Sequence, residues 1–178
     1  MQVTPVSEPV TGCEPWSDLT QPLAALAQFY RALNTRDLAL LQENWEDSPE
    51  AAMDNPLGGI RRGWAEIRTV YERLFQNPAT FRFEFWDYTL HATGDVFWVV
   101  GRERGTFTPP GGPPLDLSIR TTRLFRRDPS ARWRQAHHHG SIERPELLAS
   151  YQRAVLGGAD VSPAIGTAGD VGTSPPRL

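Results

Sequence analysis

Lysine is absent from this chain of 178 residues, and all 18 basic residues are arginines. Schiff-base chemistry and pyridoxal phosphate chemistry both require a lysine amine, so the sequence excludes them. The chain has a single cysteine, Cys13, which excludes a disulfide framework, a thiolate metal site and a Cys-x-x-Cys redox pair. The net charge of −3 at pH 7 also leaves no excess of positive charge for binding a phosphate backbone. We therefore expect no cofactor and no nucleic acid partner.

No apolar run approaches the roughly 18 residues that a membrane-spanning helix requires. Residues 1–19 have neither the basic start nor the apolar block of a signal peptide, so we expect a soluble, cytoplasmic protein with no membrane partner. The length fits one domain. Because residues 1–17 and 157–178 contain few side chains that can be buried, we predict a flexible leader and a disordered tail around a single domain at 18–156.

Helical periodicity is confined to two regions before residue 80. Apolar residues recur at helical spacing after Asp18, a candidate cap, and Asn34 and Thr35 interrupt the pattern before a second segment at 37–45. This predicts a helical hairpin. A further helix is predicted over 64–76, where the Asn-Pro pair that follows stops it.

From Thr80 onward the apolar period changes to two, which predicts strands. The apolar phase changes between Phe85 and Trp86, and a phase change within one strand indicates a β-bulge. A Thr-Gly-Asp turn signal then links the first strand to the next. The later predicted elements are strands at 96–107, 115–125 and 133–141 and a short helix at 145–155.

Helices followed by hairpin-linked strands predict an α+β fold, in which the helical hairpin and the further helix pack on one side of a curved, mostly antiparallel sheet. The segment 96–100, VFWVV, is apolar at every position, whereas a strand with one solvated face alternates. The outer face of this strand therefore needs a cover. We predict a homodimer through the outer face of the sheet, with a cover from the same chain as the alternative.

Several strings, in this order, resemble the nuclear transport factor 2-like superfamily over about residues 20–145: QFYRALNTRDLALLQENW, DNPLGGIRRGWAEI, TTRLFRRDPSARW and HHHGS. They are similar to its SnoaL-like branch and to the association domain of calcium/calmodulin-dependent kinases. The resemblance implies a cone of helices and curved sheet that often encloses a pocket. It leaves the function open, because this scaffold carries isomerases, dehydratases, cyclases, epoxide hydrolases and binding modules.

The resemblance to the ketosteroid isomerases of this superfamily places Asn55, Phe29 and Thr121 at the positions of the catalytic base, the pocket tyrosine and the proton-donating acid. Asn55 cannot take a proton, and the neighbouring Asp54 points to the opposite face of a strand unless a bulge rotates it. We therefore predict that steroid isomerisation by that mechanism is absent.

The resemblance to the kinase association domain places Arg123 of the string TRLF at a pocket arginine, while a second pocket arginine falls on Gly140. Thr121 shares a strand face with Arg123 and is expected in the same space. Arg102 and Arg104, two residues apart in the neighbouring strand, are candidates for the rest of an anion-binding site.

Three consecutive histidines lie on the last predicted strand. His137 and His139 share one face and can present two imidazoles to a metal, but nothing fixes a third ligand beyond the candidates Asp87 and His91, and we predict no metal. His138 points to the other face, where the resemblance implies a pocket. An imidazole titrates near pH 6.5, which suits a general acid or base.

The sequence as a whole predicts a protein that binds a small organic ligand in a pocket, as a cofactor-independent cyclase, isomerase or dehydratase. In this hypothesis His138 transfers a proton, Asn55 donates a hydrogen bond to developing oxygen charge, and Arg123 anchors an anionic group. Tyr30 has a hydroxyl that can reach the pocket. The alternative is a non-catalytic ligand-binding or association module, in which Arg123 holds a metabolite or a partner carboxylate.

Overall fold

The computed structural model describes residues 5–156, so the predicted tail at 157–178 lies outside the described residues. The helices are α1 (Pro22–Thr35), α2 (Leu38–Asn44), α3 (Gly63–Gln76) and α4 (Leu148–Leu156), with a 3-10 turn, η1 (Pro145–Leu147), before the last. The strands are β1 (Ala52–Asp54), β2 (Ile60–Arg62), β3 (Thr80–Thr93), β4 (Val96–Thr108), β5 (Leu115–Arg127) and β6 (Trp133–Ile142). Within this part of the chain, no helix is long and apolar enough to cross a membrane.

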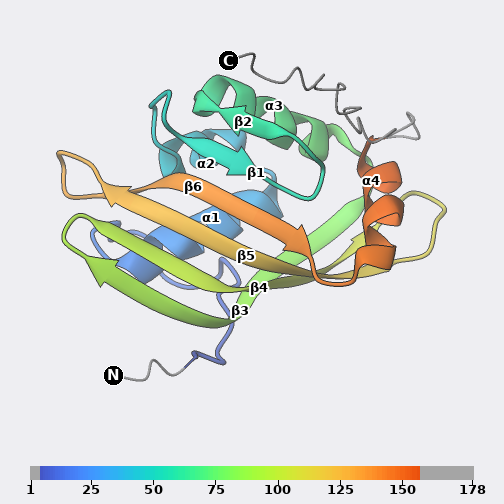
Figure 1. Cartoon of the computed structure of the whole chain (residues 1–178), viewed down its shortest axis with the longest axis horizontal. Coiled ribbons are helices and arrows are strands. Elements are labelled where there is room, and N and C mark those ends of the chain that lie inside the picture. Colours follow the sequence, from blue (N-terminus) through green and yellow to red (C-terminus); the bar gives the residue numbers. More distant parts are fainter. Residues whose placement is uncertain (1–4, 157–178) are drawn as a thin grey trace, which may run out of the picture.

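The six strands form one mixed sheet in the order β2-β1-β6-β5-β4-β3. β1 runs parallel to β6, and the other neighbouring pairs are antiparallel. The long strands curve, with α1 and α3 on one side of them and α4 at one end (Figure 1). The predicted α+β fold is therefore confirmed, and the concave side of the sheet is the side that the helices cover.

The helical hairpin is confirmed, but the predicted cap is wrong. α1 begins at Pro22, whose fixed φ suits the first helical position, whereas Asp18 accepts a hydrogen bond from the backbone of Thr20 (3.2 Å) instead. α2 does have a side-chain cap, because the carboxylate of Asp37 accepts from the backbone N–H of Leu40 at 2.9 Å.

The predicted bulge in β3 is centred on Asp87, which has a φ of 48°, and the register with β4 shifts there. The extra residue lets Phe85 and Tyr88 both point into the core, although they are three positions apart. On β4, a Cβ added to Gly101 would lie 2.5 Å from the Cβ of Tyr88, so only glycine fits opposite the bulge.

Part of the segment 5–17, which the sequence predicts as a flexible leader, packs against the sheet. Val6 and Val10 form backbone bridges with Tyr88 and Phe85 of β3, and the side chain of Val10 is buried. β3 is one of the two edge strands, and an edge strand leaves backbone donors and acceptors unpaired unless another segment covers it. The leader supplies part of that cover.

The outer face of β4 is only partly covered by the described residues. Trp98 is half-buried and stacks on the ring of His91, with 5.1 Å between ring centroids. Val100, two residues further on, is 45% exposed. The uninterrupted apolar run therefore has one phase in the core and the other on this outer face.

Candidate functional site

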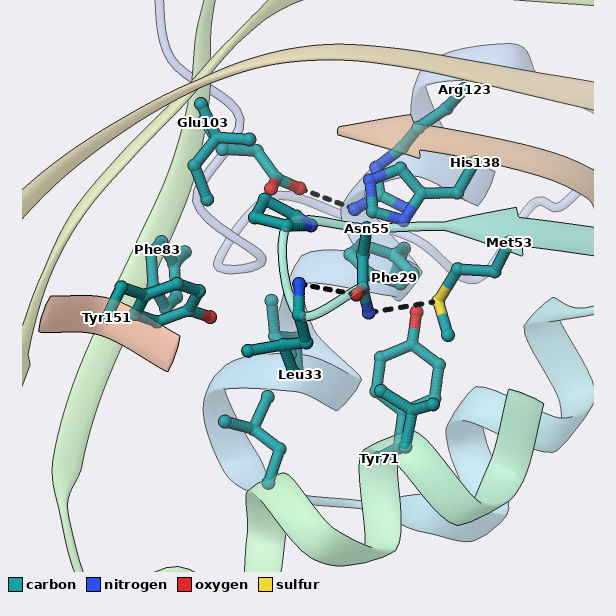
Figure 2. A pocket seen from close by; sticks show the side chains of 15 residues that line it. Phe29, Leu33, Met53, Asn55, Tyr71, Phe83, Glu103, Arg123, His138 and Tyr151 are labelled. Carbon is teal, nitrogen blue, oxygen red and sulfur yellow. Dashed lines mark hydrogen bonds and ion pairs between the residues drawn. The ribbon is translucent and has the colours of Figure 1, made fainter. Parts of the chain in front are cut away.

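A cavity of about 60 Å³ lies between the concave face of the sheet and helices α1, α3 and α4. Its wall is mainly apolar, with a few polar groups that come from different elements (Figure 2). Since one water needs about 10–15 Å³ on such a measure, the cavity has room for a small molecule the size of a few waters. The polar residues of the wall are Asn55, Tyr71, Glu103, Arg123, His138 and Tyr151.

His138 reaches the cavity from β6, where it pairs with Arg123 of β5 and Met53 of β1. It is buried, and neither ring nitrogen has a hydrogen-bond partner among the residues that the structure describes. Burial, with a further contribution from the charge of Arg123, holds its pKa well below the usual 6.5. The imidazole is therefore neutral at neutral pH.

Gly140 leaves the room that His138 occupies. A Cβ added to Gly140 would lie 3.1 Å from Nε2 of His138 and 3.3 Å from Cγ2 of Ile119. The larger side chain of an arginine, which the resemblance to the kinase association domain places here, would displace the imidazole.

Arg123 lies at the back of the cavity wall and is only 1% exposed. Its guanidinium forms an ion pair with Glu103, donates from Nη1 to Oε1 of Gln135 at 2.8 Å, and lies 3.6 Å from the centroid of the Phe29 ring. Its Nε donates to the hydroxyl of Tyr30 at 3.4 Å. Three of its five N–H donors are thus engaged within the protein, and Glu103 already balances its charge.

Glu103 is a cavity residue that the sequence analysis missed. Its Oε1 accepts hydrogen bonds from the hydroxyl of Tyr30 (2.7 Å) and from Arg123. Along β4, Glu103 shares the phase of Phe97, Val99 and Phe107, which are all fully buried. A charged residue among the buried positions of a strand would mark a candidate site. In the run 96–100, however, both sets of alternating positions are apolar, so the sequence does not show which set faces the core.

The predicted contribution of Arg102 to an anion site is wrong. Arg102 is one residue away from the inward-facing Glu103, so it points to the outer face of the sheet. There it forms ion pairs with Asp87 and with Glu143 (3.2 Å). Arg104 also faces outward and pairs with Glu84.

Tyr30 and Thr121 are buried beside the cavity without lining it. The hydroxyl of Tyr30 is directed to Glu103, and the hydroxyl of Thr121 donates to the carbonyl of Ile119 at 3.1 Å. Tyr30 is therefore hydrogen-bonded to both members of the ion pair of Glu103 and Arg123. Thr121 does not line the cavity as expected, because its hydroxyl is turned to the backbone of its own strand.

Asn55 follows β1 and reaches the cavity, as the resemblance implies. Its Oδ1 accepts from the backbone N–H of Leu57 at 2.9 Å, so the amide turns its NH₂ group toward Sδ of Met53, at 3.8 Å. Only the donor end of Asn55 is thus presented to the cavity.

Asp54 points to the opposite face, as predicted. Its Oδ2 lies 2.6 Å from Nδ1 of His139, and its Oδ1 lies 3.7 Å from Nε2 of His137. The two exposed histidines are therefore on the outer face, away from the cavity. Within residues 5–156, no group of three histidine, cysteine or acidic side chains has metal-binding geometry.

Tyr71 of α3 is a second cavity residue that the sequence analysis missed. Its hydroxyl is buried without a hydrogen-bond partner in the described part of the chain. In Figure 2 the hydroxyl points toward Asn55 and Met53. Burial raises the pKa of Tyr71 to about 12, so the hydroxyl stays protonated. The sequence places Tyr71 in the apolar stripe of a helix, where nothing distinguishes a core tyrosine from a cavity tyrosine.

A curved sheet and helices that enclose a cavity define a protein with the nuclear transport factor 2-like fold. The chain belongs to the SnoaL-like domain family, whose profile matches residues 23–145. The comparison with curated proteins gave no match.

Solved structures with this fold carry diverse names. A candidate dehydratase of the nuclear transport factor 2-like family from Streptomyces avermitilis is 24% identical, with a TM-score of 0.63 over 72% of this chain and 98% of that one. A ketosteroid isomerase-like protein from Erwinia carotovora atroseptica is 20% identical, with a TM-score of 0.60 over 72% of this chain and 98% of that one. The calcium/calmodulin-dependent kinase II hub of S. rosetta is 18% identical, with a TM-score of 0.59 over 67% of this chain and 92% of that one. At these identities the likeness establishes the fold alone.

Proposed function

We propose that this protein binds a small organic molecule in the cavity and acts on it as a cofactor-independent isomerase, dehydratase or cyclase, with His138 as the group that takes and returns a proton. The observation that carries the proposal is the imidazole itself, which is buried at the cavity wall with both nitrogens unpaired within the described chain.

The energetic cost of that arrangement supports a functional role. A buried polar atom without a partner costs about 1–3 kcal/mol, and buried polar groups are nearly always paired for this reason. A ligand in the cavity can offer His138 the partner that the protein does not. The lowered pKa keeps the imidazole unprotonated at neutral pH, which is the state that a general base needs.

Asn55 supports the same chemistry as a hydrogen-bond donor. Its carbonyl oxygen is held by Leu57, so its NH₂ group is available to an oxygen on which charge develops. Steroid isomerisation is not the reaction that we propose, because Asn55, which the resemblance places at the position of the catalytic base, cannot take a proton. The names of the solved relatives, dehydratase and ketosteroid isomerase-like, agree with the reaction class.

The second candidate function is a non-catalytic association module. The likeness to a kinase hub and the 45% exposure of Val100 on the outer face of β4 favour it. In either case we propose a homodimer that covers this outer face, since an apolar strand face is rarely left to solvent.

The test uses the purified chain and a small-molecule extract of its host, analysed by mass spectrometry before and after incubation. We expect a compound to be converted by the wild-type protein and not by His138→Gln. His137→Gln is the matched control, because His137 lies one residue away on the outer face. Conversion that persists in His138→Gln would refute the catalytic role, and a retained ligand without conversion would favour the binding module.

A further inference from the structure

We infer that the cavity selects an uncharged ligand that carries both a hydroxyl group and a carbonyl oxygen, with the hydroxyl donating to Glu103 and the carbonyl accepting from Tyr71. This inference rests on the proposed function, because it requires that the cavity holds a small organic molecule. It replaces the anionic ligand that the sequence suggested.

Glu103 provides the acceptor. Its Oε1 is occupied by Tyr30 (2.7 Å) and Arg123, whereas its Oε2 accepts no hydrogen bond from the residues that the structure describes. Because Glu103 lines the cavity, this second oxygen is the acceptor that remains for a ligand. An ionised carboxylate oxygen can only accept, so the ligand group beside it must be a donor.

The charges around the cavity favour a neutral donor. Arg123 balances the charge of Glu103 within one buried ion pair, and His138 is uncharged at neutral pH. A ligand carboxylate would be buried without a counter-charge and would face the free oxygen of Glu103. A ligand ammonium would add a positive charge to a pair that is already balanced. A hydroxyl group carries no charge, so its burial leaves no charge uncompensated.

Tyr71 of α3 provides a hydrogen-bond donor in the same cavity (Figure 2). Its hydroxyl is buried and unpartnered within residues 5–156, and it remains protonated at neutral pH. The NH₂ group of Asn55, which also lines the cavity, is a second donor. Two donors suit a carbonyl oxygen, which has two lone pairs. These two donors and the free oxygen of Glu103 together suit a ligand that carries a carbonyl oxygen and a hydroxyl group.

The test compares two isosteric probes, the neutral 4-hydroxybutan-2-one and the charged 3-hydroxypropanoate, by NMR titration of the full chain at pH 7.5. We expect the neutral probe to bind at least tenfold more tightly. Tyr71→Phe should weaken the neutral probe roughly three- to tenfold, the loss of one neutral hydrogen bond. Tyr88→Phe is the control and should change nothing, because Tyr88 is buried at the β3 bulge and does not line the cavity.

Equal or tighter binding of 3-hydroxypropanoate would overturn the inference, and so would the absence of binding by either probe. An unchanged affinity in Tyr71→Phe would remove Tyr71 from the site. The comparison of the two probes in the wild-type protein stands even if a variant fails to fold. Each negative result leaves the proposed function intact, because that function fails only if conversion of a host compound does not depend on His138.

Discussion

The buried ion pair of Glu103 and Arg123 is the feature whose disruption we expect to destabilise the protein most. Glu103→Gln keeps the shape of the side chain but removes its negative charge. The guanidinium of Arg123, with its side chain only 1% exposed, would then stay buried without a counter-charge. The hydroxyl of Tyr30 would also lose a charged acceptor.

Removing one partner of a buried pair costs about 3–5 kcal/mol of unfolding free energy. In a domain of this size, 1 kcal/mol changes the Tm by about 2–4 °C, so we expect a decrease of roughly 6–20 °C. Glu84→Gln is the matched control, because it breaks an ion pair at the surface. In that pair the side chain of Arg104 is 45% exposed and that of Glu84 is 29% exposed. That change should cost less than about 1 kcal/mol.

Urea unfolding followed by tryptophan fluorescence, together with thermal unfolding, measures both variants. The double variant Glu103→Leu/Arg123→Met should lose less stability than Glu103→Gln, since it leaves no buried charge. Equal small losses in Glu103→Gln and Glu84→Gln would refute the reasoning, because they would mean that Arg123 reaches solvent or another counter-charge.

Three further predictions concern the histidine, the bulge and the outer face. The pKa of His138 in the folded protein is below 6.5, its value in the unfolded chain, so below pH 6.5 the unfolded state binds more protons. The unfolding free energy therefore falls as the pH decreases below 6.5, by up to about 1.4 kcal/mol per pH unit. Urea unfolding at pH 7.5 and 5.5 should show a smaller loss in His138→Gln and the wild-type loss in His137→Gln; equal losses in both would contradict the lowered pKa. Gly101→Ala places a Cβ 2.5 Å from that of Tyr88 and should cost about 1–3 kcal/mol in thermal unfolding, whereas an unchanged Tm would mean that the bulge yields. Val100→Glu should separate the proposed dimer in light scattering, and a mass unchanged from wild type would exclude the outer face as its interface.

Local pattern was sufficient for most of the secondary structure. The helix over α3 follows from one apolar stripe and a stop signal, and both act within a few residues of each other. The bulge in β3 follows from the phase change after Phe85, because a strand can bury both phases only by inserting a residue. By contrast, no local signal shows that Val10 pairs with β3, since its partner Phe85 lies 75 residues away and only the folded sheet creates the edge.

The candidate site was predictable where it depended on strand alternation. His138 and Asn55 lie at the cavity as the resemblance implied, and His137 and His139 lie on the outer face. Arg102 was placed wrongly, since alternation fixes which residues share a face but does not say which face is concave. Glu103 was missed for the same reason.

The sequence by itself determined the helical hairpin, the third helix, the four long strands, the bulge and the separation of His138 from its two neighbours, because these depend on spacing along the chain; the short strands β1 and β2 have no such pattern. Only the tertiary structure decided that Arg123 is paired with Glu103, that Tyr71 points into the cavity, and that the cavity is small. Those properties depend on how side chains from α1, α3, β4 and β5 meet, and contacts between distant segments leave no periodic trace in the sequence.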